Sequence, residues 1–267
     1  MEPLTLFLKT VVLRPYVFLF LAAFLFAGIE LIGWPRTWRF WLISWATAFV
    51  CEFFSTRTGI PFGWYHYTGS TVGQELYFAN IPFMDSISFS FLLYAAYCVA
   101  LCFLLPRASP DVTGRLLPLR LDLSVRTSRR TLALAALLFA CIDMVIDPVA
   151  LRGDRWFLGK IYDYPNSGTH FGVPVANYVG WAVVGLIALS VYFMLDRSLA
   201  PLAARDGAST TSRLLMGVGL YYGVLAFNLG VTFWIGEALL GMTGVLIFFL
   251  PTVLLVLRLT GRPTVDG

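Results

Sequence analysis

The sequence has few charged residues for its length. Only 13% of its 267 residues are Asp, Glu, Lys or Arg, while 58% are hydrophobic. Soluble domains carry about 25% charged residues, so a soluble fold of this size would lack polar surface. The abundance of large apolar residues also excludes intrinsic disorder. Together with a mean hydropathy of +0.78, these values favour an integral membrane protein.

Lysine, histidine and cysteine are also scarce, and each scarcity excludes a kind of site. Lys9 and Lys160 lie outside the apolar runs, which excludes a retinal Schiff base within a helix. His66 and His170 lie in loops, and no HExxH motif is present, so we expect no metal. The four cysteines lie inside apolar runs, where packing is expected rather than disulfides. Without a glycine-rich nucleotide motif or a GxSxG elbow, we expect no cofactor.

Seven apolar runs are long enough to cross a bilayer, which requires about 20 residues. They cover residues 16–34, 37–56, 83–105, 131–151, 175–195, 214–234 and 238–257. We therefore predict an all-α polytopic membrane protein with a single transmembrane domain over residues 1–267. The first run is too long for the apolar core of a signal peptide and is followed by six more, so we expect it to be retained.

Lysine and arginine are distributed unevenly between the two sides of these runs. The side of the N-terminus carries Lys9, Arg14, Arg57, Arg152, Arg155 and Lys160. The other side carries Arg36, Arg39, Arg107, Arg115, Arg120, Arg126, Arg129, Arg130, Arg197, Arg205, Arg213, Arg258 and Arg262. Because positively charged loops stay in the cytoplasm, we expect a cytoplasmic C-terminus and an outer N-terminus in a bacterial or archaeal cell membrane. The arginine-rich connection after residue 105 is expected to be solvated and not to bind nucleic acid.

Five carboxylates lie at the N-terminal-side ends of the predicted spans. They are Glu52, Asp85, Asp143, Asp147 and Glu237. Asn177 opens a span from the same side, whereas Glu30 lies at the other end and is expected to be interfacial. An ionisable group inside a membrane costs roughly 2.5–3.5 kcal/mol. Either these groups join helices by hydrogen bonds, or they form a site in which one carboxyl group acts as a general acid.

Two long connections on this side, 57–82 and 152–174, are rich in aromatic residues. They predict either an ordered cap over a pocket or an interfacial aromatic belt. Each contains a Tyr-x-Tyr motif, Tyr65-x-Tyr67 in the first and Tyr162-x-Tyr164 in the second. In each case an acid at a helix end precedes the motif. A proline follows the motif, and a polar residue stands three positions after that proline. The pattern predicts an internal repeat of two-helix units.

An acid site without a cofactor, inside an apolar and aromatic pocket, suits a lipid polyene. Protonation of a trisubstituted alkene gives a tertiary carbocation, which aromatic faces and carboxylates stabilise. Capture of this cation by water gives a tertiary alcohol, and capture by a neighbouring double bond gives a ring.

Four stretches carry a resemblance to a known family. They are Glu52-x-x-Ser55-x-x-x-Gly59-x-Pro61-Phe62-Gly63-x-Tyr65-x-Tyr67, Ile81-Pro82-x-x-Asp85-Ser86, Asp143-x-x-x-Asp147-Pro148-x-Ala150 and Gly172-Val173-Pro174-x-x-Asn177-Tyr178-x-Gly180-Trp181. Over residues 15–257 the chain resembles the membrane carotenoid biosynthesis family, which includes gamma-carotene 1'-hydratases and bisanhydrobacterioruberin hydratases. The resemblance implies addition of water to the terminal 1,2 double bond of an acyclic carotenoid.

If the chain hydrates a carotenoid, as the resemblance implies, each of these polar residues has an expected role. We expect Asp143 or Asp147 to donate the proton, and Glu52 or Asp85 to position and deprotonate the water. Expected residues of the substrate site are Asn177, Tyr65, Tyr67, Trp64, Trp181 and Tyr164. Expected partners are a lycopene-, gamma-carotene- or C50-type carotenoid, the lipid bilayer and other carotenoid enzymes.

Three alternatives stay open. A carotenoid or terpene cyclase would use the same protonation without water. A carotenoid-binding membrane protein would hold pigment without turnover. A transporter would use the paired intramembrane acids as a proton relay.

Overall fold

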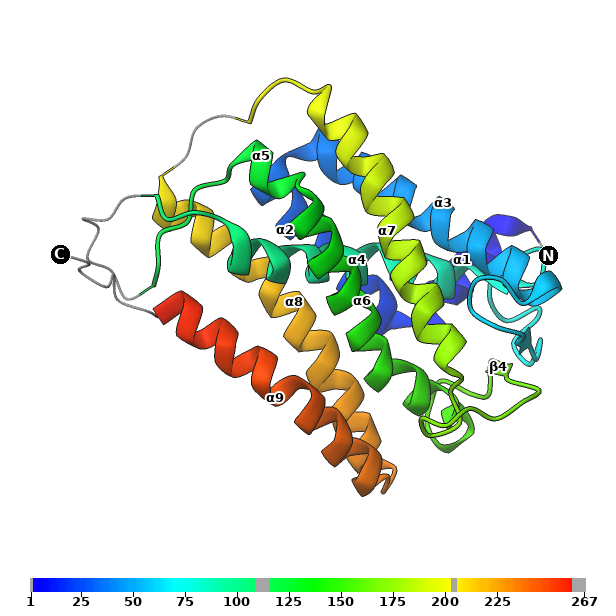
Figure 1. Cartoon of the computed structure of the whole chain (residues 1–267). Coiled ribbons are helices and arrows are strands. Elements are labelled where there is room, and N and C mark those ends of the chain that lie inside the picture. The colour runs from blue at the N-terminus through cyan, green and yellow to red at the C-terminus, as the bar shows by residue number, and fades with distance from the viewer. Residues whose placement is uncertain (1, 109–115, 203–205, 261–267) are drawn as a thin grey trace.

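A computed structural model describes residues 2–108, 116–202 and 206–260 as a bundle of α-helices (Figure 1). Three of the arginines counted above, Arg115, Arg205 and Arg262, lie outside the described residues. The long helices are α2 (Pro15–Ile32), α3 (Trp34–Thr58), α4 (Phe83–Leu104), α6 (Arg129–Ala150), α7 (Val175–Arg197), α8 (Gly207–Trp234) and α9 (Ala238–Thr260). The short ones are α1 (Pro3–Leu13), α5 (Leu123–Arg126) and the 3-10 helix η1 (Gly153–Arg155).

Six of the described helices, α2, α4, α6, α7, α8 and α9, are long and apolar enough to cross a membrane. The predicted span over 37–56 lies within α3, which has sufficient length at 25 residues. This helix is less apolar because it carries Arg36, Arg39, Glu52 and Arg57. It nevertheless packs in the bundle against α2, α4 and α7. The prediction of an all-α polytopic membrane protein is therefore confirmed.

Burial differs strongly between the helices. α4 is buried along nearly its whole length, in contact with α3, α6 and α8. α9 lies at the edge of the bundle (Figure 1) and exposes Leu246, Phe249 and Leu250. An exposed apolar face of this length suits the hydrocarbon interior of a bilayer. The start of α1 and the end of α9 lie at opposite ends of the bundle (Figure 1).

The end of α3 is set by Gly59, which adopts the left-handed conformation with φ of 77° that glycine tolerates best. The Ser55 hydroxyl then accepts the backbone N–H of Phe62 at 2.9 Å, which turns the chain back over the bundle. Phe62 packs on Gly180 of α7, where a β-carbon would lie 2.4 Å from the Phe62 ring. Gly180 thus allows the loop to approach α7 closely.

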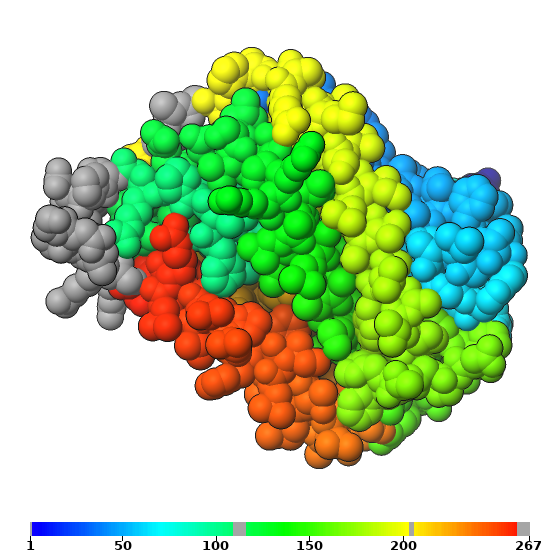
Figure 2. Space-filling model, in the orientation of Figure 1, coloured from blue at the N-terminus to red at the C-terminus, as the bar shows by residue number. Residues whose placement is uncertain are grey.

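The two long connections form an ordered structure at one end of the bundle, here called the cap (residues 59–82 and 151–174). β1 (His66–Tyr67) pairs antiparallel with β4 (Tyr162–Asp163), with Tyr67 opposite Tyr162. β2 (Tyr77–Phe78) pairs with β3 (Ile81–Pro82). Figure 2 shows the two segments, in cyan and yellow-green, packed side by side. Of the two predicted arrangements, the structure has the ordered cap.

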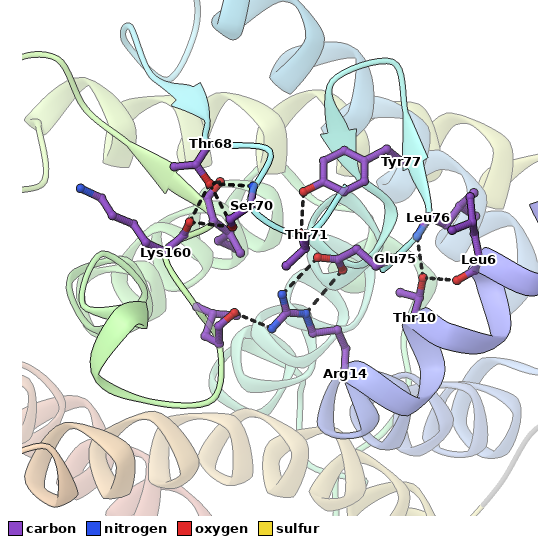
Figure 3. Close-up of polar contacts among 12 residues, drawn as sticks. Leu6, Thr10, Arg14, Thr68, Ser70, Thr71, Glu75, Leu76, Tyr77 and Lys160 are labelled. Atoms are coloured by element: carbon purple, nitrogen blue, oxygen red, sulfur yellow. Dashed lines mark hydrogen bonds and ion pairs between the residues drawn. The ribbon is translucent and has the colours of Figure 1, made fainter. Parts of the chain in front are cut away.

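Polar contacts join the cap to the junction between α1 and α2 (Figure 3). The Arg14 guanidinium donates to the Glu75 carboxylate at 3.1 and 3.4 Å and to the Leu158 carbonyl at 2.6 Å. The side chains of Arg14 and Glu75 are 1% and 0% exposed. Thr68 donates to the Lys160 carbonyl at 2.6 Å and so links the two segments directly. One buried cation therefore holds both halves of the cap.

Candidate active site

The first group of acids lies where α3 ends and α4 begins. Glu52 is in the last two turns of α3, and Asp85 is in the first turn of α4. The Tyr67 hydroxyl, from β1, lies 2.9 Å from Glu52 Oε1 and 2.6 Å from Asp85 Oδ2. A phenol has one hydrogen to donate, so it can satisfy only one ionised carboxylate. The second contact requires a carboxyl group that carries its own proton.

The second group lies where α6 ends and α7 begins. Asp143 and Asp147 are one turn apart on α6, and the Asn177 amide nitrogen donates to them at 2.6 and 2.9 Å. The hydroxyls of Tyr162 and Tyr164, from the cap, donate to Asp147 at 2.5 and 2.7 Å. Asp147 thus accepts three side-chain hydrogen bonds, a pattern that stabilises an ionised carboxylate.

Two carboxyl oxygens in the site have no hydrogen-bond partner among the described residues, Glu52 Oε2 and Asp143 Oδ1. Both side chains are buried, at 2% and 0% exposure. A buried ionised oxygen without a partner is costly, so these two oxygens are favourable positions for protons. Within the described ranges, no group of three His, Cys, Asp or Glu side chains is placed to hold a metal ion.

The cap tyrosines remain neutral donors. Burial raises the pKa of Tyr67 well above its ordinary value, and the nearby Asp85 and Glu52 raise it further. Burial and the adjacent Asp147 raise the pKa values of Tyr162 and Tyr164 in the same way. Their hydroxyl hydrogens are therefore retained at neutral pH and can hold the carboxyl groups in place.

Two cavities meet at the acids. A polar cavity is lined by residues from both groups, including Glu52, Tyr67 and Asn177. An apolar cavity extends from it between α2, α4, α6 and α8. Four residues line both cavities, namely Asp85, Asp147, Tyr162 and Trp181. The carboxyl groups of Asp85 and Asp147 therefore face an apolar chamber on one side and a polar chamber on the other.

Aromatic rings form much of the apolar cavity wall. Trp181, which lines both cavities, stacks on Phe89 of the polar cavity with ring centroids 4.3 Å apart. In the apolar cavity Tyr16 stacks on Phe227 at 5.2 Å, and Phe20 and Phe227 meet edge to face. Aromatic faces attract cations, so this wall suits an apolar molecule that becomes positively charged next to the acids.

The hydrogen bonds repeat between the two halves of the site. Tyr67 donates to Glu52, fifteen residues earlier, and Tyr162 donates to Asp147, also fifteen residues earlier. Tyr67 and Tyr162 face each other in the β1–β4 pair. The repeated motif instead matches Tyr67 with Tyr164, so Tyr67 and Tyr162 have the same spacing to an acid without occupying the same position in the two Tyr-x-Tyr motifs.

Some of the predicted site residues lie away from the cavities. Trp64 is 57% exposed, packs on Gly59 and lines neither cavity. Asp143 also lines neither cavity and is connected to the site through Asn177. By contrast, Tyr65 and Tyr164 line the polar cavity, as does Asn177, and Trp181 lines both.

Two further predicted acids form ion pairs outside the site. Glu237 pairs with Arg152 at 3.1 Å and also with Arg155. Glu30 pairs with Arg213 at 3.2 Å at the other end of the bundle. Four of the five carboxylates grouped by sequence thus come together in one site.

The sequence alone did not assign roles to Tyr162, Phe89, Ser88 or Asn228. Tyr162 had a signal in the Tyr-x-Tyr motif, and Asn228 had one as an amide within an apolar span. Ser88 had one in its position three residues after Asp85, on the same helix face. Phe89 had none, because a phenylalanine in a membrane helix is unremarkable without knowledge of its neighbours.

Comparison with known proteins identifies the family of the chain. The family model described as carotenoid biosynthesis protein matches residues 11–251. The chain is 31% identical over 194 residues to a protein of Haloarcula japonica named bisanhydrobacterioruberin hydratase. This match covers 72% of the chain and 56% of the relative, so the chain spans a little over half of that protein's length. No solved structure matches the chain. Because the family model covers most of the sequence, the predicted resemblance is confirmed, and the chain belongs to the carotenoid biosynthesis protein family.

Proposed function

We propose that this protein is a carotenoid 1,2-hydratase, which adds water to the terminal C1–C2 double bond of an acyclic carotenoid and needs no cofactor. The observation that carries the proposal is the position of Asp85 and Asp147 between an apolar and a polar cavity. The apolar cavity suits the hydrocarbon end group, and the polar cavity suits the water that carries protons between the two acids. Membership of the family and the name of the haloarchaeal relative support the same reaction.

We assign the proton donor to Asp85. The contacts of Tyr67 require a proton on Glu52 or Asp85. The unpartnered Oε2 of Glu52 favours a proton on Glu52, but of these two only Asp85 lines the apolar cavity as well as the polar one, so Asp85 is the group placed to deliver a proton to the substrate. The sequence pattern favoured Asp143 or Asp147 for this role. The hydrogen bonds to Asp147 instead favour its ionised form, which suits it to stabilise a cation and to accept a proton from water.

The reaction then follows from the positions of the groups. Asp85 transfers its proton to C2, and the positive charge develops at C1 next to the Trp181 ring and the Asp147 carboxylate. A water molecule forms the C1–O bond, and Asp147 takes its proton, which leaves a tertiary alcohol. The product is the substrate plus one water.

The proton must return from Asp147 to Asp85 before the next turnover. Both residues line the polar cavity, together with the hydroxyl groups of Tyr67 and Tyr162. Water in this cavity connects the two carboxyl groups and carries the proton back. The two halves of the site are thereby reset without an external acid or base.

The proposal is tested by pigment analysis in a lycopene-producing host that expresses the chain. We expect a carotenoid heavier by one water, and we expect Asp85→Asn and Asp147→Asn to lower its yield at least about 100-fold. Glu237→Gln is the matched control, since this carboxylate lies in an ion pair outside the site. A product isomeric with lycopene would instead indicate a cyclase. Full yield from both Asn variants would overturn the assigned roles.

A further inference from the structure

Two polar side chains face the apolar cavity without belonging to either acid group. Ser88 lies on α4, one turn after Asp85, and Asn228 lies on α8. Asn228 is only 6% exposed. A polar amide in an apolar membrane helix is costly and usually serves a function.

Neighbouring contacts place Ser88 and Asn228 at the same depth. α4 and α8 run in opposite directions (Figure 1), and Gly217 of α8 packs against Cys98 of α4. Asn228 is eleven residues further along α8, and Ser88 is ten residues back along α4. At 1.5 Å per residue, the two lie level to within about 1.5 Å, on different walls of one cavity.

Both side chains retain unused hydrogen-bonding capacity. The Asn228 amide nitrogen donates one hydrogen to the Val224 carbonyl at 3.0 Å, which leaves its second hydrogen and its oxygen. The Ser88 hydroxyl donates to the Asp85 carbonyl at 2.7 Å, which leaves its lone pairs. Neither side chain has another hydrogen-bond partner in the described part of the chain. A hydrocarbon end group can use none of these atoms, whereas a water molecule can both donate to them and accept from them.

We infer that Ser88 and Asn228 hold the water molecule that attacks C1, an inference that rests on the proposed hydratase function. Ser88 follows Asp85 by three residues, or about 4.5 Å along the helix. A proton from Asp85 and a water held one turn deeper can therefore reach the two neighbouring carbons, C2 and C1. The C1–O bond forms, an O–H bond of the water breaks, and Asp147 accepts the released proton.

The test separates protonation from water capture. Purified protein is incubated with lycopene in deuterium oxide, and both the alcohol and the recovered lycopene are analysed by mass spectrometry. Asn228→Leu keeps the branching of the side chain at Cγ but removes the hydrogen bonds. We expect alcohol formation to fall about tenfold or more, while deuterium enters the recovered lycopene at least as fast as with the wild type, because a cation that water does not capture loses a proton from C2 and returns to the alkene. Ser88→Ala should act in the same direction.

The matched control is Tyr222→Phe, which removes a polar group of α8 that faces Thr252 of α9. We expect this variant to match the wild type in both products. The inference is overturned if Asn228→Leu forms alcohol at the wild-type rate, or if it loses alcohol and deuterium exchange together. Failure of the wild type to form any alcohol would instead count against the proposed function itself.

Discussion

At the residue scale, the phenols of the cap decide where protons lie in the site. Tyr67 contacts Glu52 and Asp85, and it supplies the only hydrogen bond that joins these two carboxyl groups among the described residues. Tyr162 and Tyr164 supply two of the three side-chain hydrogen bonds to Asp147. The tyrosines thus favour a protonated Asp85 and an ionised Asp147, although both residues are aspartates.

The Tyr67→Phe substitution tests this role. We expect it to lower hydration about 100-fold, because Glu52 and Asp85 lose the hydroxyl group that joins them, while the packing of the ring is kept. The measurement is alcohol formation per amount of purified, folded protein. Tyr77→Phe is the control, since Tyr77 lies in the same cap segment but contacts Thr71. Equal losses in both variants would show that the cap needs hydroxyl groups only for stability.

Stability at alkaline pH provides a second prediction. The pKa values of Tyr67 and Tyr162 are raised by burial and by nearby carboxylates. Because the pKa is raised in the folded state, the neutral phenol contributes its full stabilisation below the pKa of the unfolded state, which is about 10. Above that pH the unfolded state loses its phenol proton first, and the stabilisation decreases. We expect the unfolding temperature in detergent to fall above about pH 10 and to fall less steeply in Tyr162→Phe. Identical slopes would contradict the assigned environment.

The sequence identified most of the acids but not their individual roles. Glu52, Asp85, Asp143 and Asp147 were grouped correctly because their depth in a span follows from counting residues. Their protonation could not be predicted, because it depends on cap residues up to eighteen positions away, and loop geometry is not periodic. Trp64 was placed in the site as an aromatic residue of the first long connection, whereas its side chain is exposed and packs on Gly59.

At the element scale, the cap depends on the buried pair of Arg14 and Glu75. Removing one partner of a buried ion pair leaves an uncompensated charge and costs about 3–5 kcal/mol. We therefore expect Glu75→Gln to lower the free energy of unfolding by about that amount, together with hydration, because the cap tyrosines lose their position.

The matched control is the exposed pair of Arg120 and Asp122, whose side chains are 63% and 27% exposed. Asp122→Asn removes that pair and should cost at most about 1 kcal/mol. Reversible unfolding of the purified protein in mixed micelles measures both variants. If Glu75→Gln were no more destabilising than Asp122→Asn, the cap would not depend on the buried pair.

The helices were predictable, and the cap was predictable only in outline. Long apolar runs and proline or glycine at their ends determine α2, α4 and α6–α9. The pairing of β1 with β4 could not be inferred, because two-residue strands carry no alternation and their partners are about 95 residues apart. The sequence pattern did relate the two Tyr-x-Tyr segments to each other, and these segments are the ones that pair.

At the scale of the whole molecule, the charge distribution sets the orientation in the membrane. The described arginines of the side opposite the cap include Arg36, Arg107 and Arg130. We propose that this side is cytoplasmic and that the cap faces outward. A fluorescent protein fused after the C-terminus should fluoresce, and alkaline phosphatase fused there should be inactive. Active phosphatase would show that the protein has the opposite orientation, and the proposed site would be unchanged.

The acid site is also a property of the whole molecule. Its carboxyl groups come from three helices, its phenols come from both segments of the cap, and the apolar cavity extends to α2 and α8. A sequence can indicate each part from its residue types, but only the packed bundle brings Asp85 and Asp147 to the same pair of cavities.

The origin of the oxygen atom in the product tests the central claim most directly. Purified protein is supplied with lycopene in oxygen-18 water under normal air, and the product is analysed by mass spectrometry. Acid-catalysed hydration predicts one oxygen-18 atom in a hydroxyl group at C1, in a product heavier than lycopene by one labelled water. A hydroxyl group without the label would show that the oxygen comes from elsewhere, and it would contradict the account.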